Sequence, residues 1–203
     1  MVKQIACSLF VEDRVQESAA RSLIECVFSE AGLPVTTQLR TGLGGFGAML
    51  SDLKGYGRRL ESQPGAPDLI VVLIDEDGQG ANVRRKTVQE SLPSSVVPHS
   101  VIGIPEPRIE DWYLADGAAW ADAYGVTRAV VVAAQAEGNS KCGLAKLLAS
   151  EDMSAASLFA TTDAAPFADD LVTNSECTRA SIGSPSLLRF IQDLRGVAKV
   201  LGA

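Results

Sequence analysis

The sequence predicts an α/β fold in which a mostly parallel sheet is flanked by helices. Residues 69–74 form an uninterrupted apolar run, largely β-branched, which is typical of a strand buried on both faces. Residues 3–11 predict an earlier strand, residues 15–30 a helix and residues 35–40 a further strand; this order favours a parallel pair with a right-handed crossover. Residues 184–202 place apolar side chains at helical spacing and predict a C-terminal helix.

Length and composition predict one compact domain with an appended helical part. At 203 residues, with 46% hydrophobic and 21% charged residues, the chain is ordinary for a soluble globular protein. We divide it into an α/β core over residues 1–135 and a helical extension over residues 136–203 that packs on the core. No apolar run reaches the roughly 18 residues that span a bilayer and no signal-peptide pattern opens the sequence, so we expect a cytoplasmic protein without a membrane partner.

The net charge argues against non-specific binding of nucleic acid, and the cysteine and histidine content argues against a zinc site. The net charge of −7 argues against broad, non-specific adhesion to nucleic acid, although a carboxylate cluster that cations neutralise is compatible with a nuclease. The four cysteines are widely spaced and His99 is the only histidine, so we expect no zinc site. The sequence makes no prediction about oligomeric state.

The glycine-rich segment at residues 41–50 lacks both a Walker lysine and the G-x-G-x-x-G spacing, which favours a flexible loop over a phosphate cradle. It leads into a predicted helix over residues 48–61. Residues 108–120 predict one helix, in which Asp116 interrupts the apolar face. Residues 128–134 are apolar enough for a further strand, with a helix as the alternative.

Acidic residues follow three of the predicted strands. Glu12 follows the first strand, Asp75 and Asp77 follow the central apolar run, and Glu106 and Glu110 follow a short strand at residues 100–104. Because the carboxyl ends of parallel strands share one edge of a sheet, and ligands bind at that edge, we expect these carboxylates to lie close together.

Clustered carboxylates repel one another unless a cation lies between them, and Mg²⁺ prefers oxygen ligands. Asp75 and Asp77 are two residues apart, so a locally extended backbone would point both carboxylates the same way. Alone, this segment is better explained as an acidic turn that solvates the end of a strand. The acids after two further strands favour a site that binds Mg²⁺ or Mn²⁺ and activates water for attack on a phosphodiester.

Four segments carry a resemblance to a known family. LFVED (9–13) and LIDEDG (73–78) resemble the glutamate and Asp-x-Asp motifs of the Toprim domain, a Rossmann-like domain of topoisomerases, bacterial primases and nucleases of the OLD (overcoming lysogenization defect) family. Asp13 stands where that family has a glycine. IPEPRIEDWYLAD (104–116) and SPSLLRFIQDLR (184–195) are similar to segments of a small Toprim-like family of unknown function that is encoded beside ATPases in bacterial defence contexts.

The resemblance implies a Mg²⁺- or Mn²⁺-dependent nuclease that acts on DNA or RNA, in an anti-phage defence system with a partner ATPase. It implies Glu12 and Glu110 as catalytic residues, with Glu12 as the general acid/base. It implies Asp75 and Asp77 as metal ligands, with Glu12, Glu110 and Glu106 as further ligand candidates. Glu110 is favoured over Glu106 because it stands in the family-like segment.

Basic residues near these segments are candidate phosphate contacts, and solvated helix faces are the alternative explanation for them. The candidates are Arg84, Arg85, Lys141, Arg179 and Arg189. The resemblance places Asp111 and Asp116 behind the metal ligands.

Two other functions stay open at the level of sequence. One is a non-catalytic subunit that docks an ATPase and uses the acidic edge structurally. The other is a receiver-like signalling domain in which Asp75 accepts a phosphoryl group. That fold requires a lysine after a late strand, and Lys141 lies too far downstream to fit well.

Overall fold

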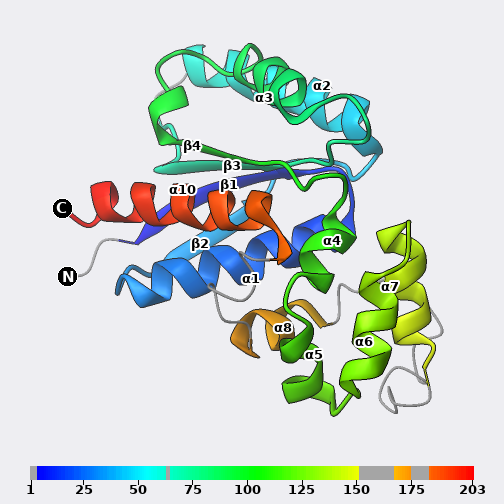
Figure 1. The fold of residues 1–203 in the computed structure, drawn as a ribbon. Coiled ribbons are helices and arrows are strands. Elements are labelled where there is room, and N and C mark those ends of the chain that lie inside the picture. The colour runs from blue at the N-terminus through cyan, green and yellow to red at the C-terminus, as the bar shows by residue number, and fades with distance from the viewer. Residues whose placement is uncertain (1–3, 63–64, 151–166, 175–182) are drawn as a thin grey trace.

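The computed structural model describes residues 4–62, 65–150, 167–174 and 183–203 (Figure 1). Its centre is a four-stranded, all-parallel sheet with the strand order β2-β1-β3-β4. The strands are β1 (Ile5–Val11), β2 (Val35–Leu39), β3 (Leu69–Leu73) and β4 (Ser100–Gly103). The predicted α/β class is therefore confirmed, with the Rossmann-like arrangement of a parallel sheet between helices.

Helices cover both faces of the sheet and form three layers (Figure 1). α1 (Arg14–Glu30) and α10 (Pro185–Leu201) lie on one face, and α2 (Gly45–Ser62) and α3 (Ala81–Gln89) lie on the other. Because successive side chains of a strand alternate between faces, the sheet contributes to two separate cores. Every residue of β3 is buried, which explains the uninterrupted apolar run in the sequence.

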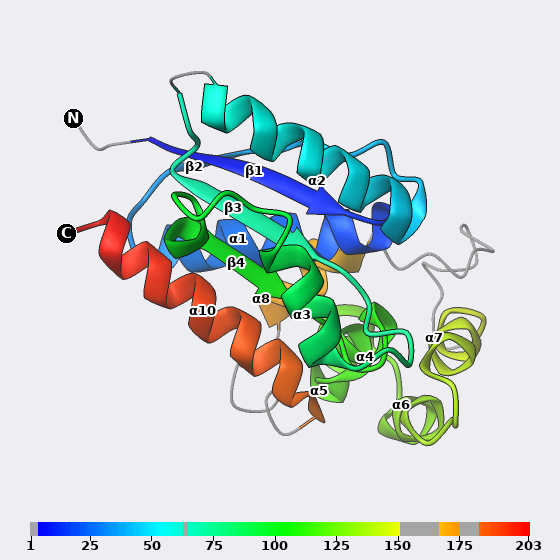
Figure 2. The same ribbon diagram turned by 90° about the horizontal axis from the view of Figure 1, so that it is seen from above.

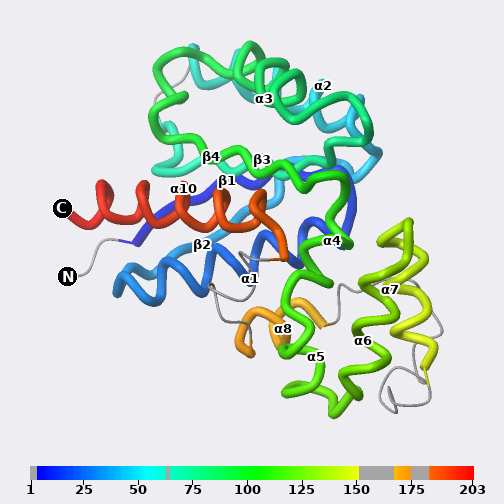
Figure 3. Tube along the Cα trace, in the orientation of Figure 1, coloured from blue at the N-terminus to red at the C-terminus, as the bar shows by residue number. Residues whose placement is uncertain are grey.

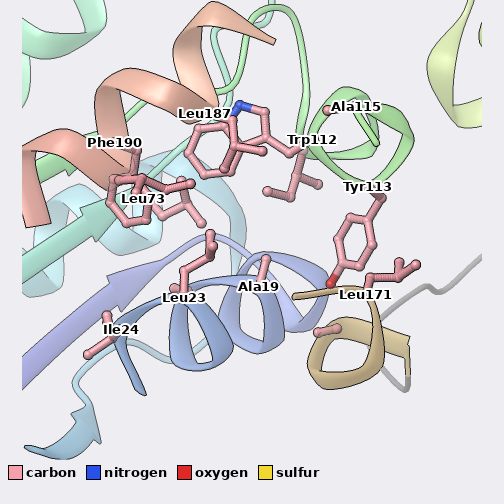
Figure 4. Packing of buried hydrophobic residues seen from close by; sticks show 14 of the residues in the cluster. Ala19, Leu23, Ile24, Leu73, Trp112, Tyr113, Ala115, Leu171, Leu187 and Phe190 are labelled. Atoms are coloured by element: carbon pink, nitrogen blue, oxygen red, sulfur yellow. The ribbon is translucent and has the colours of Figure 1, made fainter. Parts of the chain in front are cut away.

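The C-terminal helix α10 packs against α1 and β4 (Figure 4). The Ser184 side chain caps it by accepting a hydrogen bond from the backbone N–H of Leu187, and Pro185 occupies the first turn. Phe190 lies directly over Gly103 of β4, where an added Cβ would come within 2.7 Å of its ring. A side chain at residue 103 would therefore push α10 off the sheet.

Short helices follow β4 in the remaining described part of the chain. They are α4 (Ile109–Leu114), α5 (Gly117–Tyr124), α6 (Arg128–Gln135), α7 (Ser140–Leu148) and α8 (Ala168–Asn174). The prediction of one helix over residues 108–120 was wrong: the chain breaks at Asp116, whose side chain caps α5 by accepting from Ala118 N–H. No helix within the described ranges is long and apolar enough to cross a membrane.

The expected strand at residues 128–134 was also wrong, and its helical alternative is confirmed as α6. Val131 and Ala134 are its buried residues, three apart as helical packing requires. Gly143 of α7 lies so close to α6 that an added Cβ would stand 2.2 Å from the carbonyl oxygen of Ala134. Contact with α7 and α5 thus stabilises a valine- and alanine-rich run as a helix. Figures 2 and 3 show this helical hairpin to one side of the sheet.

Candidate carboxylate site

The site lies between β1 and β3, at the point where the order in which the strands are added to the sheet reverses. β1 and β3 are neighbours; the chain leaves β1 for β2 on one side and leaves β3 for β4 on the other. Open α/β sheets bind ligands at the carboxyl ends of two strands arranged in this way. Glu12 follows β1 directly, and Asp75 follows β3 after one residue. The two meet there, because the backbone N–H of Asp75 donates a 3.1 Å hydrogen bond to Glu12 Oε1.

Asp75 is the centre of the cluster and links the sheet to α4. Its Oδ1 accepts a 2.9 Å hydrogen bond from the backbone N–H of Ile109, the first residue of α4. The pKa of Asp75 is raised from its ordinary value of 3.8 to about 7, above all because the half-buried carboxyl is desolvated. The negative charges of Glu12, Glu110 and Asp77 raise this pKa further. Three carboxylates, from three places in the chain, therefore act on Asp75.

Glu110 reaches this cluster from the first turn of α4. Its residue surface is only 8% exposed, and its carboxylate has no hydrogen-bond or ion-pair partner in the part of the chain that the structure describes. Neither carboxylate oxygen is among the buried, unpartnered side-chain atoms of the described residues, so the carboxylate of Glu110 reaches solvent beside Asp75.

Glu12 is held by the turn that joins β1 to α1. Its pKa is raised mainly by burial and also by Asp77, while the hydrogen bond from Asp75 N–H and the positive charge of Arg84 lower it. The residue after it, Asp13, caps α1 by accepting from Gln16 N–H. Asp13 has φ −149°, an extended backbone that any residue adopts, so the turn does not need the glycine of the Toprim motif.

Asp77 occupies a tight turn and faces two arginines. Its backbone has φ +50°, and its exposed side chain lies 3.7 Å from Arg84 and 3.6 Å from Arg108. Glu76, the acid between the two aspartates, has a different role: its carboxylate accepts from the backbone N–H groups of Gly78 and Gly80. Glu76 therefore stabilises the turn.

The remaining predicted acids lie around this centre. Glu106 is exposed, 3.5 Å from Arg189, and is not among the charges that shift the pKa of Asp75. Asp111 accepts a 2.8 Å hydrogen bond from Ser140, and burial raises its pKa. Asp116 is the buried N-cap of α5.

Of the other predicted phosphate contacts, Arg85 and Lys141 lie on α3 and α7. Neither forms an ion pair with a carboxylate among the residues described. Arg179 lies outside the described residues.

The donor chemistry suits a hard divalent cation, since every group in the cluster is a carboxylate. Within the described ranges, however, no three His, Cys, Asp or Glu side chains are arranged to hold a metal ion. The hydrogen bonds explain part of this arrangement. Glu12 and Asp75 each have one oxygen bound to a backbone N–H, and Asp77 faces the arginines. Common ligation by all of them would require Asp77 to rotate.

Two contributors were not predicted from the sequence. Phe46 packs its ring against the guanidinium of Arg84, with 4.0 Å between the Cζ atom and the ring centroid. Arg108 is the N-cap residue of α4 and pairs with Asp77. The only signal for Phe46 was an aromatic residue in an otherwise glycine-rich loop, directly before a predicted helix.

The fold and the cluster define a class of protein: a parallel α/β domain with an acidic site at the switch point of its sheet. Comparison with protein-family models, with curated proteins and with solved structures gives no match for this chain. The Toprim resemblance therefore stays a prediction that rests on four segments of the sequence.

Proposed function

We propose that this chain is a Toprim-like nuclease domain that hydrolyses phosphodiester bonds of DNA or RNA with Mg²⁺ or Mn²⁺. The observation that carries the proposal is the environment of Asp75. Three other carboxylates act on it at the ligand-binding edge of the sheet, and its pKa is raised to about 7. Such a concentration of like charge is costly to fold, and a bound cation would relieve the repulsion.

The roles follow from the positions of the residues. A divalent cation, when bound, polarises the phosphate and lowers the pKa of an attacking water. Asp75, Asp77 and Glu110 would supply its oxygen ligands, with the free oxygen of Asp75 and the unpaired carboxylate of Glu110 as the nearest candidates. Glu12 would accept the proton of the water, because it follows β1 directly beside Asp75 and only one of its two oxygens is bound to the Asp75 N–H.

Cleavage of labelled DNA and RNA, single- and double-stranded, tests the proposal in Mg²⁺, Mn²⁺ and EDTA. We expect cation-dependent cleavage that falls about 100-fold or more in Glu12→Gln and Asp75→Asn. Glu61→Gln, an exposed change at the far end of α2, is the matched control and should keep activity. Calorimetry that detects neither Mg²⁺ nor Mn²⁺ binding, or binding unchanged by Asp75→Asn, would contradict the proposal.

A partner ATPase and a role in anti-phage defence belong to the same proposal and are supported by the sequence resemblance alone. Cleavage should then be stimulated by the partner and its ATP. A chain that cuts nothing, with or without the partner, would instead fit the alternative of a non-catalytic subunit.

The strand order favours one competing function. The order 2-1-3-4 also occurs in receiver domains, where an aspartate after the third strand accepts a phosphoryl group. Against this, the charged groups with the largest effect on the pKa of Asp75, among the residues that the structure describes, are all carboxylates. Incubation with acetyl phosphate, followed by mass spectrometry of the Asp75 peptide, separates the two: a nuclease domain should remain unmodified.

A further inference from the structure

We infer that Arg84 and Arg108, the two arginines flanking Asp77, bind the phosphodiester backbone of the substrate, and that Phe46 positions Arg84 for this task. The inference rests on the proposed function for the identity of the anion, a nucleic-acid backbone. It goes beyond that function in naming the residues that hold the substrate and the loop that orients them.

Arg84 is held in place but weakly paired. Its side chain is only 12% exposed and packs on the Phe46 ring at 4.0 Å. Its Nε donates a long 3.4 Å hydrogen bond to the Glu76 carbonyl, and its Nη2 lies 3.7 Å from Asp77 Oδ2. A guanidinium has five N–H donors, so most of its capacity is unused within the described part of the chain. A stacked, largely buried arginine with free donors is pre-organised to bind an anion.

The helix α2 begins at Gly45, inside the glycine-rich segment expected to be a loop, and the anchoring of its first turn explains how Phe46 reaches Arg84. The Thr41 hydroxyl donates a 2.9 Å hydrogen bond to the Val11 carbonyl, and Gly45 N–H donates a 3.2 Å bond to the Glu12 carbonyl. Gly45 has φ +80°, a conformation that favours glycine. The start of α2 at Gly45 is therefore fixed to the end of β1, and the next residue, Phe46, lies in the first turn of α2 against α3, beside the acidic turn.

Arg108 approaches the other oxygen of the same carboxylate. Its Nε lies 3.6 Å from Asp77 Oδ1, and its side chain is 43% exposed. One carboxylate thus lies between two guanidinium groups, at distances longer than a good hydrogen bond. A phosphodiester has two non-bridging oxygens that match guanidinium donors, so it can replace these long contacts to Asp77 on both arginines.

The two arginines explain how an acidic chain could bind nucleic acid. A chain with a net charge of −7 cannot rely on overall attraction to bind nucleic acid. Two arginines beside the carboxylates supply positive charge only at the site, so binding should be local and depend on few contacts. The salt dependence of binding should therefore be shallow, with a slope that each arginine changes by about one.

The test measures binding of fluorescein-labelled DNA and RNA oligonucleotides by anisotropy, in Mn²⁺, with Glu12→Gln as the background that prevents cleavage. We expect Arg84→Ala and Arg108→Ala each to weaken binding about 10- to 100-fold. Arg84→Lys, which keeps the charge but loses the planar fork, and Phe46→Leu, which removes the ring, should give smaller losses. Lys86→Ala, an exposed change on α3 that removes the same charge, is the matched control.

Calorimetry with Mn²⁺ alone checks that the arginine variants still bind the cation, and thermal melting checks that they fold. The inference is overturned if both alanine variants bind oligonucleotide as tightly as the Lys86→Ala control, or if the parent chain binds none. Cleavage by an otherwise unchanged Arg84→Ala chain would overturn this inference and leave the proposed function intact. Binding that depends on the arginines, without cleavage in any cation, would support the inference and overturn the proposed function.

Discussion

Replacing Asp75 by asparagine should stabilise the cation-free protein at neutral and alkaline pH. In the folded chain the pKa of Asp75 is about 7, compared with 3.8 as its ordinary value. Below about pH 4 the group carries a proton in both states, so it affects stability little. Between about pH 4 and pH 7 the unfolded chain ionises while the folded chain keeps its proton, so stability falls as pH rises. Above pH 7 the whole penalty of the buried charge is present.

The size of the effect follows from the pKa difference. At about 1.4 kcal/mol per pH unit, the difference corresponds to an upper limit of about 4 kcal/mol. Water at the half-buried site screens part of the repulsion, so we expect a gain of about 1 to 3 kcal/mol for Asp75→Asn at pH 8. For a chain of this length that is a rise in Tm of roughly 2 to 12 °C. Asparagine keeps the Oδ1 acceptor that binds Ile109 N–H, so the link to α4 is preserved.

The assay is thermal melting of both proteins in EDTA between pH 4.5 and 8.5. The gain should shrink toward zero at the acidic end, because neutral Asp75 and asparagine then carry the same charge. Asp193→Asn, an exposed change on α10, controls for the general effect of removing a negative charge. A gain that is independent of pH, or a variant less stable than the parent at pH 8, would refute the assigned environment of Asp75.

Three further predictions concern cation binding and the packing of α10. In urea titrations, Mg²⁺ or Mn²⁺ at 100 times its Kd should raise the free energy of unfolding of the parent by about 2.7 kcal/mol. The same cation should leave the free energy of unfolding of Asp75→Asn nearly unchanged, and equal gains in both proteins would contradict a site at Asp75. Gly103→Ala should cost about 1 to 3 kcal/mol in urea unfolding, because its Cβ would stand 2.7 Å from atoms of Leu73 and Phe190; an unchanged midpoint would show that α10 adapts freely. Ser184→Ala should cost about 1 kcal/mol in thermal unfolding and Ser184→Asp should restore it, whereas equal loss in both would argue against the N-cap.

The sheet was predictable because burial on both faces leaves a clear trace in the sequence. β3 appears as an uninterrupted apolar run, and the strand–helix order determines that its neighbours are parallel. α6 was not predictable in the same way. A short run of valine and alanine suits a strand or a helix, and the close approach permitted by Gly143 on another helix selects the helix.

The same distinction holds at the site. Glu12, Asp75 and Glu110 each come soon after a strand, so a parallel sheet brings them together and the sequence could anticipate their meeting. The direction of Asp77 could not be anticipated, because a positive φ sets it. The stacking of Phe46 on Arg84 could not be anticipated either. It depends on contacts between the segment before Phe46 and the end of β1, which is far away in the sequence.

The two tryptophans of the chain give this molecule a built-in optical signal. Trp112 lies two residues after Glu110; its indole N–H donates a 2.8 Å hydrogen bond to Ser186 and its ring lies 5.2 Å from Phe190 (Figure 4). Trp120 is fully buried in α5. Any shift of α4 that brings Glu110 onto a cation must move Trp112 relative to α10. Intrinsic fluorescence would therefore report such a shift without a label, and Trp112→Phe would show which indole reports it.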